Sequence, residues 1–165
     1  MATKFKGGNV NLVGEFIKVG AKAPEFELVK GDLSNLSLSS LKGKKVLLNI
    51  FPSLDTGVCA TSVRKFNAEA AKLDNTVILA VSKDLPFAQA RFCTTEGIEK
   101  VIPVSDFKGT DFDKVYGVLM ADGPLAGLLA RAVVVIDENG VVKYTELVPE
   151  ITQEPDYEKA LAALK

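Results

Sequence analysis

Short, unbroken runs of apolar residues constrain this chain more than any other feature of its sequence. The runs are VLLNIF at 46–51, TVILAVS at 76–82 and AVVVI at 132–136. A strand with one face in water alternates apolar and polar residues, whereas a strand covered on both faces is apolar throughout. These runs are therefore predicted to be buried strands of one sheet with helices packed against it, which is an α/β fold.

A helical pattern follows the first of these runs. Thr56 is predicted to be the N-cap, and Val63, Phe66, Ala70 and Leu73 then fall on one face of the helix. This numbering places a cysteine in the first helical turn.

A second helix is predicted after the run at 76–82. Asp84 is the expected cap, Pro86 falls in the first turn and Gly97 ends the helix. Cys93 lies in the later part of this helix.

The remaining segments predict shorter elements. VIPV reads as a short strand, and a brief helix is expected to end at Gly117. The run at 132–136 continues through DENG into VVKYTELV, which predicts a hairpin. Pro155 is expected to open the last helix, and NVNLVGEFIKVG near the N-terminus is expected to form a hairpin around a glycine. The order of elements fits a thioredoxin-like arrangement with a mixed sheet, in a single domain over residues 1–165, although periodicity alone does not separate it from other three-layer sandwiches.

Charge and composition exclude several classes of function. The formal net charge is −1, and the basic residues do not gather into a stripe, so nucleic acid is not an expected partner. No apolar stretch approaches the length needed to cross a membrane, and MATKFKGGNV lacks the apolar core of a signal peptide, so a cytoplasmic protein is expected. The absence of histidine excludes Cys-His pairs, Ser-His-Asp triads and histidine-bearing metal sites.

Cys59 is the strongest candidate for chemistry. As the third residue of its helix, it lies where the partial positive charge of the N-terminus favours a thiolate. The hydroxyl of Thr56 is expected to reach the sulfur, and Pro52 fixes the backbone that enters the loop. The alternative is that Cys59 is a small buried apolar residue, that Thr56 only caps the helix and that Pro52 only ends the strand.

Arg131 stands out among the arginines because it enters a strand that should be buried. A buried guanidinium needs an anion, and the Cys59 thiolate is one candidate, with Glu69 or another acid as the alternative. The simplest interpretation is that Arg131 is a member of a structural ion pair. From the residues alone, Cys93 fits packing better than chemistry.

The spacing Pro52-x-x-x-Thr56-x-x-Cys59 resembles the P-x-x-x-T-x-x-C signature of the peroxiredoxin family. NIFPSLDTGVCATSVRKF, together with DLPFAQARFC at 84–93 and GPLAGLLARAVVVIDENG at 123–140, is similar to the thiol peroxidase branch of that family. The resemblance covers essentially the whole chain and shows no departure at the key positions.

The resemblance implies a thioredoxin-like fold with an extra N-terminal β-hairpin. It implies an enzyme that reduces hydrogen peroxide and alkyl or lipid hydroperoxides, with Cys59 as the peroxidatic and Cys93 as the resolving cysteine in one subunit. Thr56 and Arg131 match residues that bind the thiolate and the peroxide, and Pro52 matches a residue that shields the pocket. Thioredoxin is the expected reductant, a homodimer the expected assembly, and no metal, haem or flavin is expected.

Two other functions remain open at this point. A glutathione-peroxidase-like enzyme would share the fold, but that family usually carries a tryptophan at its site and this chain has none. A non-enzymatic redox sensor or binding module with a thioredoxin fold would not turn over peroxide in the presence of thioredoxin.

Overall fold

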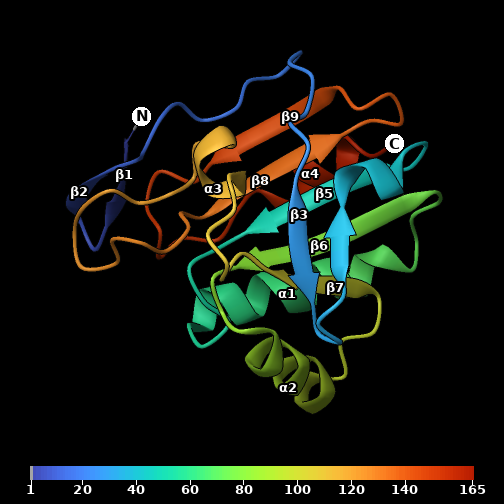
Figure 1. The fold of residues 1–165 in the computed structure, drawn as a ribbon, viewed down its shortest axis with the longest axis horizontal. Coiled ribbons are helices and arrows are strands. Elements are labelled where there is room, and N and C mark those ends of the chain that lie inside the picture. The colour runs from blue at the N-terminus through green and yellow to red at the C-terminus, as the bar shows by residue number, and fades with distance from the viewer. Residues whose placement is uncertain (1) are drawn as a thin grey trace.

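The structure is a computed structural model and describes residues 2–165. Its main sheet has seven strands in the order β4-β3-β7-β6-β5-β8-β9, and a separate sheet pairs β1 with β2. The strands are β1 (Ala2–Phe5), β2 (Gly8–Asn11), β3 (Glu27–Lys30), β4 (Asn35–Ser37), β5 (Lys45–Ile50), β6 (Thr76–Ser82), β7 (Val101–Ser105), β8 (Ala132–Ile136) and β9 (Val142–Leu147). The helices are α1 (Gly57–Ala70), α2 (Pro86–Glu96), α3 (Phe112–Val115) and α4 (Tyr157–Ala162), with a 3₁₀ turn η1 (Leu38–Leu41). Figure 1 shows this arrangement.

The centre of the sheet is parallel and its edges are antiparallel. Strand β6 pairs parallel with both β5 and β7, whereas β8 pairs antiparallel with β5, and β3 pairs antiparallel with β7. The predicted mixed α/β sheet of a thioredoxin-like fold is therefore confirmed. Within the described part of the chain, no helix has the length and apolar character needed to cross a bilayer.

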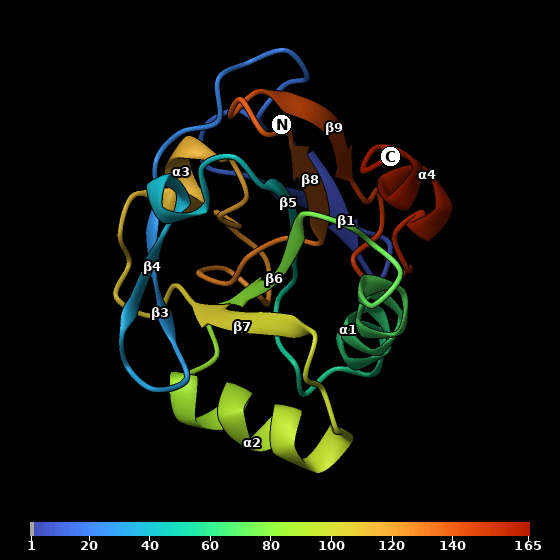
Figure 2. The same cartoon turned by 90° about the vertical axis from the view of Figure 1, so that its right-hand side faces the viewer.

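The apolar runs supply side chains to both faces of the sheet. In β5, Leu48 and Ile50 join a core with the segment before β3 and with α3, while Leu47 joins a core under α1 and α4. Figure 2 shows α1 and α4 on one side of the sheet and α3 on the other. Burial on both faces explains why these strands lack alternation.

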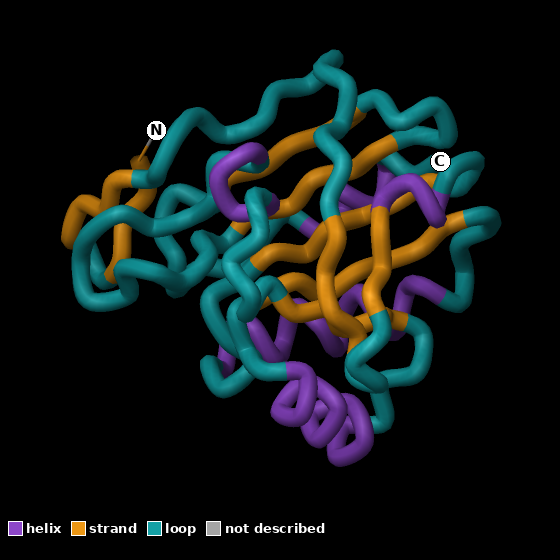
Figure 3. Tube along the Cα trace, viewed as in Figure 1, coloured by secondary structure: helices purple, strands orange, loops and turns teal. Residues whose placement is uncertain are grey.

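The N-terminal hairpin lies earlier than predicted. It turns at Lys6 and Gly7, and the expected turn glycine, Gly14, lies beyond it. Figure 3 shows the hairpin at one end of the molecule, apart from the main sheet. Its Val10 packs with Met120 and Ile151 in a small third core. The hairpin therefore packs against the segments that precede β8 and follow β9.

Two helix starts also differ from the prediction. Asp84 does not cap α2: the N-cap residue is Leu85, and the Asp84 carboxylate accepts hydrogen bonds from other segments instead. In α4 the N-cap is Asp156, one residue after Pro155, and its side chain accepts a hydrogen bond from the Lys159 backbone. By contrast, Gly97 ends α2 in the left-handed conformation, as predicted.

Candidate active site

Cys59 occupies the first turn of α1, shortly after the carboxyl end of β5. Thr56 is the N-cap residue, and the first backbone bond of the helix runs from the Ala60 N–H to the Thr56 carbonyl at 3.0 Å. Among the described residues, the N–H groups of Gly57, Val58 and Cys59 have no backbone or capping side-chain acceptor. Free donors at a helix N-terminus stabilise an anion, so this position suits an anionic group.

Arg131 contacts the sulfur of Cys59 from the start of β8. The two are brought together because Ala132 pairs with Ile50, the last residue of β5. The Arg131 Nη2 donates to Cys59 Sγ at 3.0 Å, and its Nε donates to the Ile151 carbonyl at 2.7 Å. Both side chains are buried, with 0% of Cys59 and 2% of Arg131 exposed.

Arg131 pairs with no carboxylate among residues 2–165, so the acidic partner considered as an alternative is absent there. Its remaining nitrogen, Nη1, is buried and has no hydrogen-bond partner in this part of the chain. This environment does not fit a structural ion pair, because no carboxylate of the described residues pairs with the guanidinium. A buried guanidinium that lies beside a thiol and has one unused nitrogen instead fits a site that binds an anion.

The hydroxyl of Thr56 does not donate to the sulfur as expected. It turns back and donates to the Ser53 carbonyl at 3.0 Å, as serine and threonine hydroxyls do in local turns. Its oxygen can still accept a hydrogen bond from a donor group of a bound molecule. Thr56 therefore lines the cavity and is close to Cys59 in sequence, but it does not form the predicted hydrogen bond to the sulfur.

A cavity of about 280 Å³ opens next to Arg131. Its lining residues are Phe5, Lys6, Pro52, Thr56, Gly57, Val58, Leu125, Arg131, Ile151 and Thr152. Pro52, Thr56 and Arg131 thus meet at one cavity, with the buried Cys59 behind them. Lys6, at the turn of the N-terminal hairpin, is held there by the Glu150 carboxylate, which accepts the Lys6 N–H at 2.6 Å.

The sequence does not predict the contribution of the N-terminal hairpin to this cavity. Phe5 and Lys6 carry no motif of their own, and bonds between residues distant in sequence place them there, such as the backbone bonds of Lys4 with Pro149 and Ile151. Leu125 belongs to the apolar loop GPLAGLLA, which packs largely against the third core.

Cys93 lies in the same apolar core as Cys59, under α1 and α2. Both cysteines are free thiols, and Cys93 is half-buried. Burial raises the pKa of the Cys93 thiol, so this cysteine is held protonated, and no donor approaches its sulfur among the described residues. The two thiols therefore sit in different environments, one beside a cation and one in an apolar setting.

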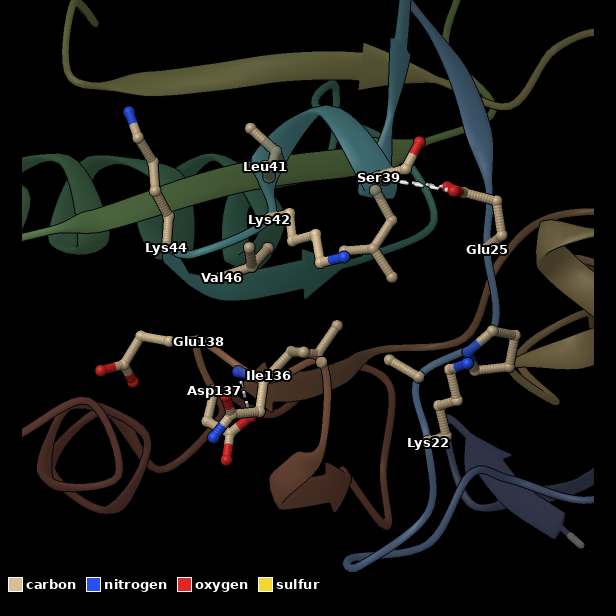
Figure 4. A pocket seen from close by; sticks show the side chains of 15 residues that line it. Lys22, Glu25, Ser39, Leu41, Lys42, Lys44, Val46, Ile136, Asp137 and Glu138 are labelled. Atoms are coloured by element: carbon tan, nitrogen blue, oxygen red, sulfur yellow. Dashed lines mark hydrogen bonds between the residues drawn. The ribbon is translucent and has the colours of Figure 1, made fainter.

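A larger cavity, of about 440 Å³, lies at the opposite end of β5 and β8 (Figure 4). Val46 and Ile136 pair across those strands at that end and line its floor. Two of its three carboxylates are already engaged: Glu25 accepts the Ser39 N–H at 3.1 Å, and Asp137 accepts the Val141 N–H at 2.9 Å. No thiol lines this cavity, so its size does not make it the reactive site.

Comparison with known proteins agrees with the fold. The Redoxin family model matches residues 18–161. A peroxiredoxin-like protein from Aquifex aeolicus has a structure that superposes with a TM-score of 0.94 at 44% identity, covering 99% of this chain and 95% of that one. A thioredoxin-like sheet with a buried thiol at the first turn of α1 thus defines a redoxin of the peroxiredoxin class.

Sequence relatives narrow the class. A thiol peroxidase from Corynebacterium glutamicum is 56% identical over 162 residues, covering 98% of both chains. A thiol peroxidase from Mycobacterium tuberculosis is 61% identical over 159 residues, covering 96% of this chain and 95% of the relative. The chain belongs to the thiol peroxidase family of peroxiredoxin enzymes.

Proposed function

We propose that this protein reduces hydrogen peroxide and organic hydroperoxides with Cys59 as the nucleophile. The observation that carries the proposal is the 3.0 Å contact between Arg131 Nη2 and Cys59 Sγ, behind a cavity that Arg131 and Thr56 both line. The guanidinium and the free N–H groups of α1 favour the thiolate before substrate arrives. No base is then needed to activate the nucleophile, which explains how a chain without histidine can perform this reaction.

In the first step the thiolate attacks one peroxide oxygen and the O–O bond breaks. The second oxygen takes the electron pair and a proton and leaves as water or alcohol, and Cys59 becomes a sulfenic acid. Negative charge moves from sulfur to the leaving oxygen, so donors fixed near that oxygen stabilise the transition state. The unused Nη1 of Arg131 is one such donor, and the Thr56 oxygen can accept a hydrogen bond from the peroxide O–H.

In the second step the Cys93 thiol attacks the sulfenic acid, which yields a Cys59–Cys93 disulfide and water. Thioredoxin then reopens the disulfide by thiol–disulfide exchange. A disulfide that must be reduced in every cycle suits a reducing compartment, so we propose the cytoplasm as the site of action.

The cavity walls favour substrates with an apolar group. Phe5, Val58, Leu125 and Ile151 supply apolar surface around Arg131. Alkyl or lipid hydroperoxides would bury their carbon chain there while the peroxide group meets the guanidinium.

A homodimer is the assembly that we propose. Leu85 and Phe87 at the start of α2 and Phe107 after β7 are large apolar side chains with 52%, 65% and 41% of their surface exposed. The Asp106 N–H donates to the Ser82 carbonyl, which brings the residue before Phe107 to the end of the strand that leads to Leu85 and Phe87. An exposed apolar group of this kind is typical of a contact with another protein, and a second copy is the occupant that we expect.

Steady-state peroxide consumption with thioredoxin and its reductase tests the reaction. Cys59→Ser should abolish turnover without changing the fold. Cys93→Ser should oxidise once at nearly the parental rate, should accumulate a sulfenic acid that dimedone traps, and should not cycle with thioredoxin. A redox sensor would show one oxidation and no turnover in the parent protein, and a Cys93→Ser variant that cycles normally would contradict the resolving role.

A further inference from the structure

Asp84 links the segments that carry the two cysteines. Its carboxylate accepts three hydrogen bonds, from Ser53 Oγ at 2.7 Å, from the Leu54 N–H at 2.8 Å and from Ser82 Oγ at 2.7 Å. Ser53 and Leu54 belong to the loop between β5 and α1, whereas Asp84 lies between β6 and α2. Bonds to an ionised acceptor are stronger than neutral ones, so this is a firm tie between the two segments.

The tie continues to the start of α1. The Ser53 carbonyl accepts both the N–H of Thr56 at 3.2 Å and its hydroxyl at 3.0 Å. Asp84 therefore fixes Ser53, Ser53 fixes the N-cap, and the N-cap sets the position of Cys59 in the first turn.

The tie also continues into α2. Gln89 is fully buried, and its Nε2 donates to Ser82 Oγ at 3.1 Å and to the Val104 carbonyl at 2.9 Å. Cys93 follows Gln89 by four residues, so both lie on the same face of the helix. An unbroken path of hydrogen bonds thus runs from the N-cap of α1 through Asp84 to the helix of Cys93.

A second link between these helices is weaker. Arg64 of α1 and Glu96 of α2 form an ion pair whose side chains are both well exposed to solvent. Exposed pairs contribute little to stability. Asp84 is consequently the principal polar tie between the loop of Cys59 and the helix of Cys93.

We propose that Asp84 is a positioning residue that holds the Cys59 loop in the form that attacks peroxide, and that it opposes the movement that brings Cys93 to the sulfenic acid. This inference rests on the proposed function. A disulfide requires Cα atoms within about 7 Å. Both cysteines are free thiols in this structure and each is held in its own helix, and we infer that the loop and the helix ends open for the second step.

Asp84 then influences the fate of the sulfenic acid. In one reaction the Cys93 thiol displaces water and forms the disulfide. In the competing reaction a second hydroperoxide transfers one oxygen to Cys59, which becomes a sulfinic acid while the peroxide leaves as water or alcohol. Strong hydrogen bonds to Asp84 keep the Cys59 loop closed, that is, bonded to Asp84, for longer, and this favours the sulfinic acid. Weak hydrogen bonds to Asp84 let the loop open sooner and favour the disulfide.

Asp84→Asn tests this inference because it keeps the size of the side chain and removes the charge. The first oxidation of Cys59 should slow about tenfold and disulfide formation should quicken by a similar factor, the size expected for one lost bond to a charged group. The fraction of sulfinic acid formed at a fixed peroxide concentration should fall accordingly. Rapid quenching followed by mass spectrometry separates the sulfenic, sulfinic and disulfide forms.

Two control variants separate a specific effect from a general loss of stability. Asp55→Asn changes a carboxylate in the same loop that accepts no hydrogen bond from the residues the structure describes, and it should match the parent. Asp137→Asn removes the negative charge of the acceptor for the N–H groups of Asn139 and Val141 in the β8–β9 turn, far along the sheet from both cysteines. It should lower the melting temperature without changing the ratio of sulfinic acid to disulfide.

The inference is overturned if the ratio of sulfinic acid to disulfide in Asp84→Asn equals the ratio in the parent and in Asp137→Asn. If Asp84→Asn does not fold, Ser53→Ala removes a single arm of the tie and should shift the ratio in the same direction by less; an unchanged ratio there also overturns the inference. A parent protein that forms no sulfenic acid would instead refute the proposed function, so the two failures are distinguishable.

Discussion

At the scale of single residues, Arg131 is unusual because its long charged side chain is almost completely buried. It is a long cation enclosed by protein, and each bond that it makes, to the Ile151 carbonyl and to Cys59 Sγ, fixes the plane of the guanidinium. Lysine could supply the charge but not two bonds in one plane with a third donor left over. The geometry of the group therefore matters as much as its charge.

Arg131→Lys should slow the oxidation of Cys59 on the order of a hundredfold, the usual effect of removing one donor that stabilises a developing negative charge. The same substitution should lower the melting temperature only slightly, because the positive charge remains. Single-turnover oxidation by hydrogen peroxide, followed by mass spectrometry, measures the rate.

Arg64→Lys and Arg91→Lys provide the controls. Arg64 forms its ion pair at the surface and Arg91 is exposed, so neither substitution should change the rate by more than a small factor. Equal losses in all three variants would show that Arg131 has no special role.

Residue-scale predictions from the sequence succeed where one dominant interaction decides the outcome. A buried arginine needs an anionic neighbour, and the contact of Arg131 with Cys59 is one of the options that the sequence offers. The predicted bonds of Thr56 and Asp84 are wrong because their oxygens have several partners within reach, and only the folded loop decides among them. The catalytic roles of these residues stay predictions.

At the scale of elements, the short helix α3 is held by a close approach of two backbones. The segment before β3 passes beside the end of α3, where the Ile17 N–H donates to the Tyr116 carbonyl at 3.2 Å. Gly117 closes the helix with φ 68°, and a Cβ there would lie 2.0 Å from the Glu15 carbonyl oxygen. Glycine is required at this position both for its backbone angle and for its lack of a side chain.

Gly117→Ala should therefore lower the free energy of unfolding by about 3 kcal/mol or more, because the left-handed conformation and the backbone clash both add to the cost. Gly43→Ala is the matched control, since Gly43 also has a positive φ of 88°, but a Cβ added there would have no atom within 4 Å. Its cost should be about 1 kcal/mol, from backbone conformation alone. Urea unfolding followed by circular dichroism measures both, and equal losses would refute the role of the close approach.

Elements are predictable from the sequence in proportion to their burial. Strands β6 and β8 begin and end where the apolar runs do, because water is excluded from both faces. Strands β3 and β4 lie in a segment whose sequence shows turn residues and a short Leu-rich pattern, since near the edge of the sheet their pairing depends on partners distant in sequence. The N-terminal hairpin is predicted around Gly14 because nothing local distinguishes that glycine from Gly7, where the chain does turn.

At the scale of the whole molecule, a buried charge cluster joins the sheet to α3. Lys83 follows β6, and its Nζ lies 3.1 Å from Asp106, after β7, and 2.8 Å from Asp113 in α3. Burial raises the pKa of Asp106, against the attraction of Lys83. Burial opposes the charge on Lys83, but the two carboxylates outweigh it and raise the pKa of Lys83. One cation thus serves two anions, and Asp106 is the anion that folding disfavours.

The sign of the pH dependence follows from that shift. A carboxyl whose pKa is raised by folding contributes stability below its unfolded pKa and loses that contribution as the pH rises through its folded pKa. Asp106→Asn should therefore stabilise the protein at pH 7, because it removes a charge that folding disfavours. The gain should disappear below about pH 3, where Asp106 is protonated in both states.

Thermal unfolding of the parent and of Asp106→Asn between about pH 3 and pH 7 measures the difference in their stability. Asp113→Asn is the control, because it removes the shorter contact with Lys83 and should destabilise the protein at pH 7. A loss of stability in Asp106→Asn similar to that in Asp113→Asn would show that both carboxylates are needed by the lysine.

The complete burial of Cys59 has a consequence for chemical probes. With 0% of its surface exposed, Cys59 is covered even against a water-sized molecule, so a peroxide reaches it only when the cavity wall moves, whereas the half-buried Cys93 has some contact with solvent. A maleimide or an acrylamide drug fragment must wait for the loop to open, however nucleophilic the sulfur is. Profiling with bulky electrophiles would thus record how often the loop opens, and a low reactivity of Cys59 toward them would not contradict the nucleophilic role that we propose for it.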